Sequence, residues 1–531
     1  PDLTTKAPEK QKQSQSVGFF NDTATTEIYT TILVIEPSSI EKDVLYVGTD
    51  DGRVHVSKNA GGAWEEISKL PGLLKGSWIT QIKASNKNKG EALLVANNYR
   101  RFDYTPYAYR TTNYGRSWTR ILGPEDTQSY ALCIIEDPQE KNLLFLGTDD
   151  GLYYSTNAAK TWTKWTHGFP TVPVKDLVIQ QRENDLVIGT FGRAAWVLDD
   201  ISPLRAIAKE TRLLQERLKV FTPPTAYQAA YQQPTGSRFG ADAMYQGENK
   251  AYGAHISYWY NAKHTTAEAE ENSTQEQKQS SDSIFMKIYD KDRLIRTLKR
   301  KVPDSSGIYK WTWYLNEAGG DRPSRKIRKR KNEPSGTTVK PGNYNIFLSN
   351  DGVTTQTTIT VASDPRLVIS QKAIDQKYAT SKTIQQMTQV AADAVKQLVE
   401  SKNTAASFSK TLKKEDKKLH KEAIALSTEI SETIENLIAT YIGKEDKRQG
   451  ITRNPEVTVL NRIRTASWYG GSRPDGMTET EITLLKHAKN KLNEALDKTN
   501  AFFEKDWKAY KEAMTKVKTK PFKDIKVFSK N

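Results

Sequence analysis

The chain has 531 residues, 37% of them hydrophobic and 27% charged, and its formal net charge is +16. This length predicts roughly two to four domains. The sequence contains no stretch of about 20 apolar residues, so it predicts no transmembrane helix. The single cysteine, Cys133, excludes internal disulfides and a cysteine-based zinc site.

The positive charge has two interpretations. A nucleic-acid or anionic-surface partner would favour basic residues clustered on one face. Lysine and glutamate are instead interspersed through most of the chain, which favours an ordinary solvated surface. The dense basic run at residues 324–331 (SRKIRKRK) is compatible with binding to an anionic glycan or lipopolysaccharide, and equally with a solvated loop. We expect no nucleic-acid partner.

Residues 1–30 do not continue any pattern found downstream. Residues 19–30 (FFNDTATTEIYT) resemble the peptide that results when a sequencing-adapter read is translated, and a disordered tail is the alternative. Residues 1–16 are polar and lack the apolar core of a signal peptide. We therefore base no functional inference on residues 1–30.

Three segments share the pattern [ST]-x-N-x-[GA]-x-x-W. They are residues 57–64 (SKNAGGAW), 111–118 (TTNYGRSW) and 155–162 (STNAAKTW). The shared positions are Ser57, Asn59, Gly61 and Trp64, then Thr111, Asn113, Gly115 and Trp118, and finally Ser155, Asn157 and Trp162. The tryptophans are 54 and then 44 residues apart, which is the period of one four-stranded propeller blade.

The flanks of the boxes repeat as well. Residues 45–52 (LYVGTDDG) precede the first box, residues 144–151 (LFLGTDDG) precede the third, and residues 186–193 (LVIGTFGR) open a fourth unit without a box. Each reads as a strand, a turn and a second strand. We predict that residues 31–205 are about four blades, the C-terminal part of a larger β-propeller.

The residue types in the box indicate a folding role. Serine, threonine and asparagine hydrogen-bond the local backbone in turns, glycine supplies a positive φ, and tryptophan buries a large area between blades. The alternative, that the asparagine and aspartate side chains act on a substrate, is disfavoured because repeated loop residues are mostly structural. Asp50, Asp51, Asp149 and Asp150 are likewise expected to form turns.

Residues 206–365 return to strand patterns after a short helix-like exit. Expected strands lie at residues 284–289, 294–298, 310–315 and 344–348, with the first two forming a hairpin. We predict an immunoglobulin-like β-sandwich, interrupted by a disordered insert at 262–282 and by the basic run.

Residues 366–531 have helical periodicity. The apolar positions fall on one face in three stretches and predict an antiparallel helical bundle. These positions are Ile384, Met387, Ala391, Val395 and Leu398; Ile430, Ile434, Leu437 and Tyr441; and Ile482, Leu485, Leu492, Leu496 and Phe503. Residues 468–476 (WYGGSRPDG) are expected to be a packed aromatic loop between two helices, with a binding role as the alternative.

With these motifs, the chain resembles the sortilin-like Asp-box (BNR-type) repeat β-propeller proteins of Bacteroidetes, often labelled glycosyl hydrolase-like. The resemblance covers residues 31–531 and is most specific at 46–64, 107–118 and 170–205. It implies a propeller, a small β-sandwich and C-terminal helices, and a secreted, periplasmic or outer-membrane-associated protein. Relatives carry Asp-Gly-His-Arg and Gly-Thr-His-Gly-Arg stretches, where this chain has residues 97–100 (NNYR) and 189–193 (GTFGR). We therefore expect no metal or acid–base role at these positions.

The function that best fits these features is a non-catalytic module that binds a protein or carbohydrate ligand through variable loops on a rigid propeller. The expected ligand-binding residues are Trp78, Asn97, Tyr99, Arg100, Arg101, Tyr104 and Tyr107, with the loop at 468–476 next. Aromatic and arginine side chains stack on sugars and also fill protein pockets.

The alternative is a glycoside hydrolase similar to xyloglucan-cleaving propeller enzymes. Such an enzyme needs two carboxylates about 5–10 Å apart across the scissile bond, and Asp103, Glu125 and Asp126 are the loop carboxylates available here. None stands in a catalytic motif, and the sequence has no GxSxG, HExxH or phosphate-binding glycine loop. We expect no cofactor and no metal.

Overall fold

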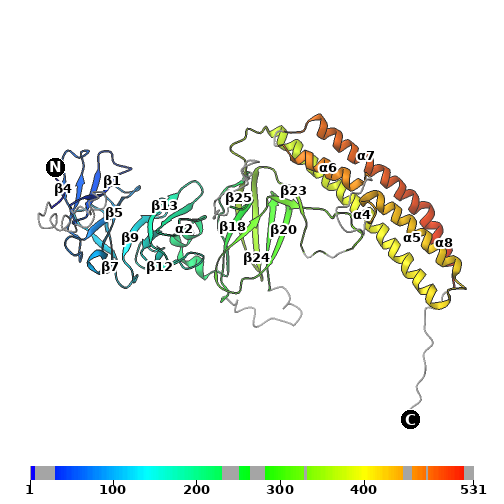
Figure 1. Cartoon of the computed structure of the whole chain (residues 1–531), viewed down its shortest axis with the longest axis horizontal. Helices are drawn as coiled ribbons and strands as arrows, with labels where there is room; N and C mark the ends of the chain where they lie inside the picture. Colours follow the sequence, from blue (N-terminus) through cyan, green and yellow to red (C-terminus); the bar gives the residue numbers. More distant parts are fainter. Residues whose placement is uncertain are drawn as a thin grey trace, which may run out of the picture. The chain divides into compact units, whose positions relative to one another are not determined.

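The computed structural model describes residues 2–5, 30–229, 250–263, 282–327, 330, 332–445, 457–473 and 476–518 (Figure 1). The chain divides into two compact units. The first comprises Pro1–Pro224, Ile256–Ser273 and Pro303–Trp311, and the second comprises Thr225–His255, Thr274–Val302 and Thr312–Asn531. Most of the segment expected to be unreliable at 1–30 and most of the insert at 262–282 lie outside the described residues.

Four antiparallel sheets follow one another along the first unit. Sheet one contains β1 (Ile32–Pro37), β2 (Leu45–Thr49), β3 (Val54–Ser57) and β4 (Glu65–Glu66); sheet two contains β5 (Trp78–Ala84), β6 (Ala92–Asn98), β7 (Asp103–Thr111) and β8 (Thr119–Leu122); sheet three contains β9 (Ala131–Glu136), β10 (Leu144–Thr148), β11 (Gly151–Ser155) and β12 (Thr163–Lys164); sheet four contains β13 (Val174–Gln180), β14 (Asp185–Thr190) and β15 (Ala195–Leu198). In each sheet, every strand pairs with the next along the chain. These sheets are blades 1 to 4 of a partial β-propeller, as the tryptophan period predicts.

Each pair of neighbouring blades shares one apolar core. Tyr46 of blade 1 packs with Leu94 of blade 2, Leu93 of blade 2 packs with Ile134 of blade 3, and Phe145 of blade 3 packs with the residues of blade 4. Both faces of an inner blade are therefore buried, which explains why the second strands of blades 2 and 3 are continuous apolar runs rather than alternating ones.

The tryptophans of the second and third boxes join consecutive blades. The indole Nε1 of Trp118 donates to the carbonyl of Ile67 in blade 1 at 3.0 Å, and Trp162 donates to the carbonyl of Ile121 in blade 2 at 3.1 Å. Trp64, in the first box, is half-buried. The box tryptophan is thus both an apolar wedge between blades and a hydrogen-bond donor to the preceding one.

Each box closes a small hydrogen-bonded loop on itself. The hydroxyl oxygens of Ser57, Thr111 and Ser155 accept from the amide four residues later at 2.8, 2.9 and 3.0 Å. The side-chain oxygens of Asn59, Asn113 and Asn157 likewise accept from the amide four residues later, at 2.7, 3.0 and 3.0 Å. Gly61 and Gly115 have φ of 89° and 82°, and in the third box Ala159 adopts 68° at the same position.

Helix α2 (Ser202–Lys209) ends the propeller segment. Pro203 lies in its first turn, where a missing amide hydrogen is tolerated. Leu204 and Ala208 pack into the core shared by blades 3 and 4. On the same helix, Arg205 forms a buried ion pair with Asp137 at the end of β9, so the helix is fixed to the propeller by both apolar and ionic contacts.

Residues 206–365 are mostly strands, as predicted. After η2 (Thr211–Gln215), β16 (Leu218–Val220), β18 (Ala254–Tyr260) and β21 (Gly307–Trp313) form one sheet, and a five-stranded sheet has the order β17 (Ala226–Gln228), β25 (Val353–Ser363), β24 (Gly342–Asn350), β19 (Ser283–Asp290) and β20 (Arg293–Lys301). The predicted hairpin at 284–298 is β19–β20. A two-stranded sheet pairs β22 (Asn316–Ala318) with β23 (Ser335–Thr338).

The described part of the basic run does not form a free cationic patch. Arg325 donates to Glu435 at 2.9 Å and to the carbonyl of Gly443 at 2.6 Å, and Arg330 pairs with Asp321 at 3.0 Å. Residues 328, 329 and 331 lie outside the described residues. Two of the basic residues thus have acidic partners within the second unit.

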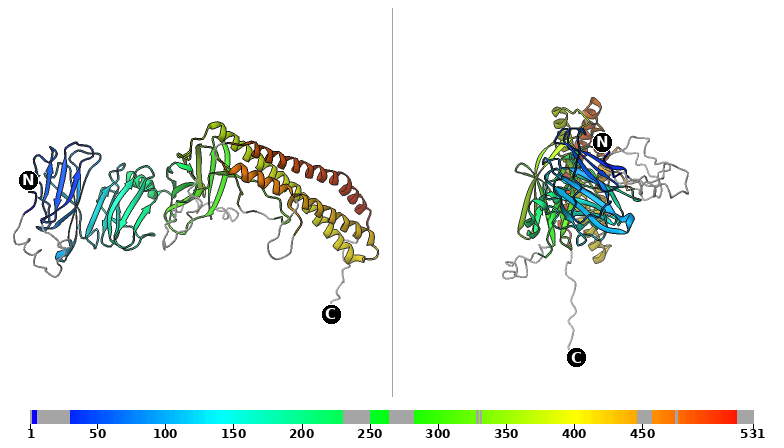
Figure 2. Two further views of the ribbon diagram at one scale, coloured as in Figure 1. Left: turned by 45° about the horizontal axis from the view of Figure 1, so that its top comes forward. Right: turned by 90° about the vertical axis from the view of Figure 1, so that its left-hand side faces the viewer.

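The C-terminal region is helical. Its helices are α4 (Gln371–Asp416), α5 (Lys421–Ile442), α6 (Val459–Gly471), α7 (Glu479–Ala501), the π-helical η3 (Phe502–Asp506) and α8 (Trp507–Thr515). Figure 2 shows α4, α5 and α7 running along one another. Among the described residues, no helix has a stretch long and apolar enough to cross a bilayer.

The prediction of a loop at 468–476 is wrong in its first half, because residues 468–471 are the last turn of α6. The helix extends through two glycines because Val459, Ile463 and Ala466, spaced four and three residues apart, anchor it on the bundle. Trp468 is 73% exposed on the opposite side of this helix.

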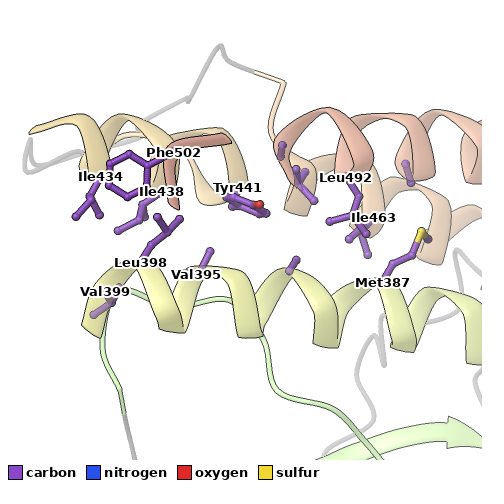
Figure 3. Packing of buried hydrophobic residues seen from close by; sticks show 14 of the residues in the cluster. Met387, Val395, Leu398, Val399, Ile434, Ile438, Tyr441, Ile463, Leu492 and Phe502 are labelled. Carbon is purple, nitrogen blue, oxygen red and sulfur yellow. The ribbon is translucent and has the colours of Figure 1, made fainter. Parts of the chain in front are cut away.

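The predicted apolar faces form one bundle core (Figure 3). Val395 and Leu398 of α4 face Ile438 and Tyr441 of α5. Farther along α4, Met387 lies near the apolar side chains that α6 and α7 contribute to the core. The prediction is wrong for one position, since Ile482 at the start of α7 is 51% exposed.

Candidate functional site

The hairpin between the second and third strands of blade 2 is longer than its counterparts. In blades 1 and 3 this hairpin joins strands of four or five residues, β2 to β3 and β10 to β11. In blade 2 it joins β6, of seven residues, to β7, of nine, through the short helix η1 (Tyr99–Arg101). We call residues 97–107 the aromatic hairpin. Because all such turns lie at one end of a propeller, its tip extends beyond that end of the neighbouring blades.

Four of the expected ligand-binding residues lie together at this hairpin. The guanidinium carbon of Arg100 is 3.3 Å from the ring centroid of Trp78 and 5.4 Å from that of Tyr99. Tyr99 stacks on Tyr130 of blade 3 with centroids 4.7 Å apart, and Tyr104 lies 6.1 Å from Tyr130. Trp78, Tyr99, Arg100, Tyr104 and Tyr130 are called the aromatic cluster below.

The aromatic cluster spans two blades and is fixed in place. Trp78 is the backbone partner of Asn97 in the pairing of β5 with β6, one residue before the register shift between Ile79 and Gln81. Tyr130 donates to Asp149 in the turn of blade 3 at 2.9 Å, and burial raises the pKa of its phenol. Tyr104 is 53% exposed. The cluster therefore combines a rigid base with an exposed aromatic ring.

Phe102, at the tip of the aromatic hairpin, is 85% exposed and has φ of 61°. A bulky residue in the left-handed region is uncommon and costs free energy. In blade 4, Phe191 occupies the equivalent turn and is 70% exposed, with the Lys175 ammonium 5.8 Å from its ring centroid. The end of the propeller that carries the aromatic cluster thus has exposed aromatic rings on blades 2 and 4.

The other three expected ligand-binding residues are buried or hydrogen-bonded to the protein itself. Tyr107 is 4% exposed and donates to Asp103 at 3.0 Å, and Arg101 donates to the carbonyl of Lys75 at 3.0 Å. Asn97 is 1% exposed, and its amide nitrogen has no hydrogen-bond partner among the described residues. A ligand on the surface of the hairpin would contact the residues that cover Asn97 and Tyr107, and not these two side chains themselves.

The carboxylates near the aromatic hairpin serve as hydrogen-bond acceptors. Burial would raise the pKa of Asp103, but hydrogen bonds from Thr105, Tyr107 and Asn98 outweigh it and hold this pKa below its ordinary value. The same balance, with Lys164 as the main donor, lowers the pKa of Asp150 in the turn of blade 3. Both groups are therefore unsuited to donate a proton near neutral pH.

The remaining expected carboxylates, Glu125 and Asp126, lie in the turn that follows β8. Asp126 accepts from the amide of Gly123 at 2.9 Å within its own turn, and Glu125 is exposed. Burial raises the pKa of Glu36 and of Glu136. These two residues lie near the C-terminal ends of β1 and β9, at the end of the blades opposite to the aromatic hairpin, and face Lys83 and Arg110. In the part of the chain that the structure describes, no three His, Cys, Asp or Glu residues are grouped to hold a metal ion.

Two members of the site were not named from the sequence, although Phe102 lies within the loop at 97–107 that was expected to carry the ligand surface. Tyr130 precedes an ordinary buried strand, and Phe102 follows a run of polar residues, so neither stands in a recognisable pattern. The position of Phe102 could have indicated its role, because its hairpin is longer than the equivalent hairpins of blades 1 and 3. An alignment of blade 2 with those two blades would show the extra residues. Trp468 and Tyr469 belong to α6 in the other unit.

Comparisons with known proteins give distant structural likenesses. The GH74 xyloglucanase from Xanthomonas campestris matches with a TM-score of 0.26 and 14% identity over 32% of this chain and 29% of that chain. The GH74 enzyme of Niastella koreensis matches at 0.25 and 14%, over 44% and 29%, and YCF48 from Cyanidioschyzon merolae at 0.25 and 14%, over 32% and 53%. The match thus spans about half or less of each of these proteins. No protein-family model matches the chain, and no curated protein matches it.

Proposed function

We propose that this chain is part of a sortilin-like, Asp-box-repeat propeller protein, secreted or associated with the cell envelope, that binds a protein or glycan ligand without catalysis. The resemblance of the box motifs supports the family and the location. The binding surface is the aromatic cluster together with Phe102.

The observation that carries this proposal is the assembly of Tyr99, Arg100 and Tyr104 of the aromatic hairpin with Trp78 of β5 and Tyr130 of blade 3. Aromatic rings and arginine dominate binding energy in protein interfaces, and they stack on sugar rings as well. Rings held by stacking and by the Tyr130–Asp149 hydrogen bond lose little conformational freedom when a ligand binds. Exposure of Phe102 in a costly backbone conformation also favours a role at the surface over a role in folding.

A glycoside hydrolase is the second candidate, and the carboxylates of the described residues do not favour it. A hydrolase of this kind needs one carboxyl group with a raised pKa next to a carboxylate on the other side of the sugar. Near the aromatic hairpin the pKa of Asp103 and that of Asp150 are lowered. Binding therefore fits the site better than hydrolysis.

The test compares the wild-type chain with the variants Tyr104→Ala and Tyr314→Ala. The second variant is the control, because it removes a similarly exposed tyrosine (59%) from the second unit. Binding to a panel of plant and bacterial polysaccharides is measured by affinity electrophoresis, together with release of reducing sugar and capture of proteins from envelope extract. Loss of a stacking ring should weaken binding by about tenfold. The control should bind as the wild type does.

Each outcome decides between the two candidates. A polysaccharide or protein that binds the wild type and the control but not Tyr104→Ala supports the binding module. Sugar release that is lost on Asp103→Asn establishes a hydrolase and overturns the proposal. Binding that is equal in all three proteins, or no binding at all, also overturns it.

A further inference from the structure

The second unit contains a cavity where its strands meet its helices. The cavity has a volume of about 550 Å³, which is within the range of about 300–1,000 Å³ that is usual for small-molecule sites. Its strand wall is formed by the end of β17, by β23 with the turn that follows it, and by the end of β25 with the residues up to 369. Its helical wall is one face of α4, from Ile374 to Thr388, and the last turn of α6. All of these elements belong to the second unit.

Hydrogen bonds hold the two walls of the cavity together. The side-chain oxygen of Gln385 in α4 accepts from the amide and the hydroxyl of Thr337 in β23, at 3.0 and 2.9 Å. The side-chain nitrogen of Gln385 donates to the carbonyl of Ala318 in β22 at 3.0 Å. Next to Ala318, Glu317 accepts from the hydroxyl of Tyr378 in α4 at 2.5 Å. The cavity is therefore formed in advance, and a ligand would not have to order its walls.

Basic side chains outnumber acidic ones in the lining of this cavity. The lining cations are Arg322, Lys340 and Lys377. Among the described lining residues, Asp364 provides the one carboxylate, and both of its oxygens accept from the guanidinium of Arg366, at 2.8 and 2.5 Å. The charge of Asp364 is thus balanced by its own partner, and the lining has a net positive charge.

Two of the three cations have donor hydrogens available to a ligand. Arg322 is exposed, and its guanidinium forms no hydrogen bond with the described residues. Lys340 pairs with Asp375 at 3.1 Å, which leaves two of the three donor hydrogens of its ammonium group. An anion in the cavity can therefore be bound without breaking a contact of the protein.

Hydroxyl groups form a second part of the lining. Those of Tyr252, Ser363 and Ser381 come from three separate segments, and they form no hydrogen bond with the described part of the chain. The ring of Tyr252 is 38% exposed. A sugar has hydroxyl groups around its edge and C–H groups on its faces, so hydroxyl side chains and an aromatic ring match both parts of it.

We propose that this cavity binds a small acidic saccharide, made of one or two sugar rings that carry carboxylate groups. Arg322 and Lys340 bind the carboxylates through charge-assisted hydrogen bonds. The serine hydroxyls bind the sugar hydroxyls, and the ring of Tyr252 packs on a sugar face. A neutral sugar would leave the cations without a counter-charge, and a simple anion would leave the hydroxyls without partners. This site lies in the second unit and does not depend on the function proposed for the aromatic cluster of the first.

The test measures the binding of digalacturonate to the whole chain by isothermal titration calorimetry. Two further compounds separate the parts of this ligand. The dimethyl ester of digalacturonate has the same rings without the charges, and succinate has two carboxylates without hydroxyl groups. We expect each of them to bind at least about tenfold more weakly than digalacturonate, because each lacks one set of hydrogen bonds.

Three variants locate the binding site. Arg322→Gln should weaken the binding of digalacturonate by about tenfold, and its Tm should equal that of the wild type because the side chain has no partner in the fold. Lys326→Gln makes the same change of charge at an exposed residue outside the cavity and should bind as the wild type does. Tyr104→Ala, in the first unit, should also leave this binding unchanged.

Three results would overturn the inference. They are no binding of digalacturonate to the wild type, equal binding of succinate or of the ester, and a loss of binding in Lys326→Gln or Tyr104→Ala but not in Arg322→Gln. A loss confined to Tyr104→Ala would place the saccharide on the propeller and support the function proposed above. Failure of this inference is therefore distinguishable from failure of the proposed function.

Discussion

Arg205 of α2 and Asp137 at the end of β9 are 68 positions apart in the chain and form a buried ion pair. Both Nε and a terminal nitrogen of Arg205 lie 2.8 Å from the Oδ2 atom of Asp137. The other carboxylate oxygen accepts from the amides of Gln139 and Glu140, at 2.8 and 2.7 Å. Asp137 is 0% exposed, so its charge depends entirely on these donors.

Replacement of Arg205 by methionine should therefore destabilise the chain strongly. Removal of one partner leaves a buried charge uncompensated, and we expect the free energy of unfolding to fall by about 3–5 kcal/mol. Urea-induced unfolding followed by tryptophan fluorescence measures this. Lys219→Met is the control, because its pair with Glu216 is exposed and should contribute less than about 1 kcal/mol. Equal stability of the two variants would show that the buried pair does not hold α2.

The box tryptophans should differ in their contribution to stability. Trp118→Phe keeps an aromatic ring between blades 1 and 2 but leaves the carbonyl of Ile67 without its donor. We expect a loss of about 1–3 kcal/mol in the free energy of unfolding. Trp64→Phe, at the half-buried first box, should cost less than about 0.5 kcal/mol. Thermal unfolding of both variants tests this, and the reverse order would contradict the role of the indole as a link between blades.

Phe102→Gly should stabilise the chain while weakening ligand binding. The left-handed φ of Phe102 carries a cost that glycine removes, so we expect a gain of about 0.5–1 kcal/mol in the free energy of unfolding. Phe191→Gly is the matched control, since this exposed phenylalanine has no positive φ and should gain nothing. Differential scanning calorimetry distinguishes the two. Destabilisation by Phe102→Gly would show that the phenylalanine ring itself supports the hairpin.

Glu317 should make the second unit sensitive to acid. Its burial would raise the pKa, but hydrogen bonds from Arg293, Tyr378 and Lys382 outweigh this and lower it to about 2. Because the folded pKa lies below the unfolded one, the stabilisation is present above about pH 5 and is lost as the pH falls toward 2. It amounts to roughly 3 kcal/mol at neutral pH.

The variant Glu317→Gln checks the size and the sign of this effect. Its deficit in the free energy of unfolding should be full at pH 7 and should shrink toward pH 2, where the wild-type carboxyl group is also protonated. Asp375→Asn, which breaks an exposed pair with Lys340, serves as the control and should change little at either pH. A deficit that is independent of pH would mean that Glu317 acts through packing and not through its charge.

Cys133 should be unreactive in the folded chain. It is 1% exposed, burial raises the pKa of its thiol, and its Sγ donates to the carbonyl of Val174 at 3.6 Å. We expect reaction with a thiol reagent to be at least about 100-fold slower in buffer than in concentrated urea. Rapid labelling of the native protein would show that blades 3 and 4 separate readily.

The sequence predicted the blades because their signals are local. The residues that form a box lie within one short segment, and the tryptophan spacing gives the repeat directly. The bundle core was also predictable, since a helical face is set by spacing alone, as at Val395 and Leu398. Ile482 was mispredicted because the buried side of α7 in its first turn carries Glu481, which is 4% exposed, and not Ile482.

The candidate site was only partly predictable because its contacts depend on three-dimensional placement. Composition pointed to the tyrosines and arginines of residues 97–107, but not to Tyr130, which comes from the neighbouring blade. Nor could composition distinguish the exposed Tyr104 from the buried Tyr107, three residues later on β7. The end of α6 was missed because glycine and proline at 470–476 suggest a loop, whereas the tertiary contacts of Ile463 and Ala466 favour the helix.

In each box, the serine or threonine and the asparagine side chains form their turn hydrogen bonds within the eight residues of the box. The turn can therefore be kept while the loops of the same blade are lengthened. Blade 2 is an example, because it has a longer hairpin than blades 1 and 3 and keeps a box of the same geometry. In evolutionary terms, the repeat separates the residues that must be inherited unchanged from the loops in which new specificity can arise.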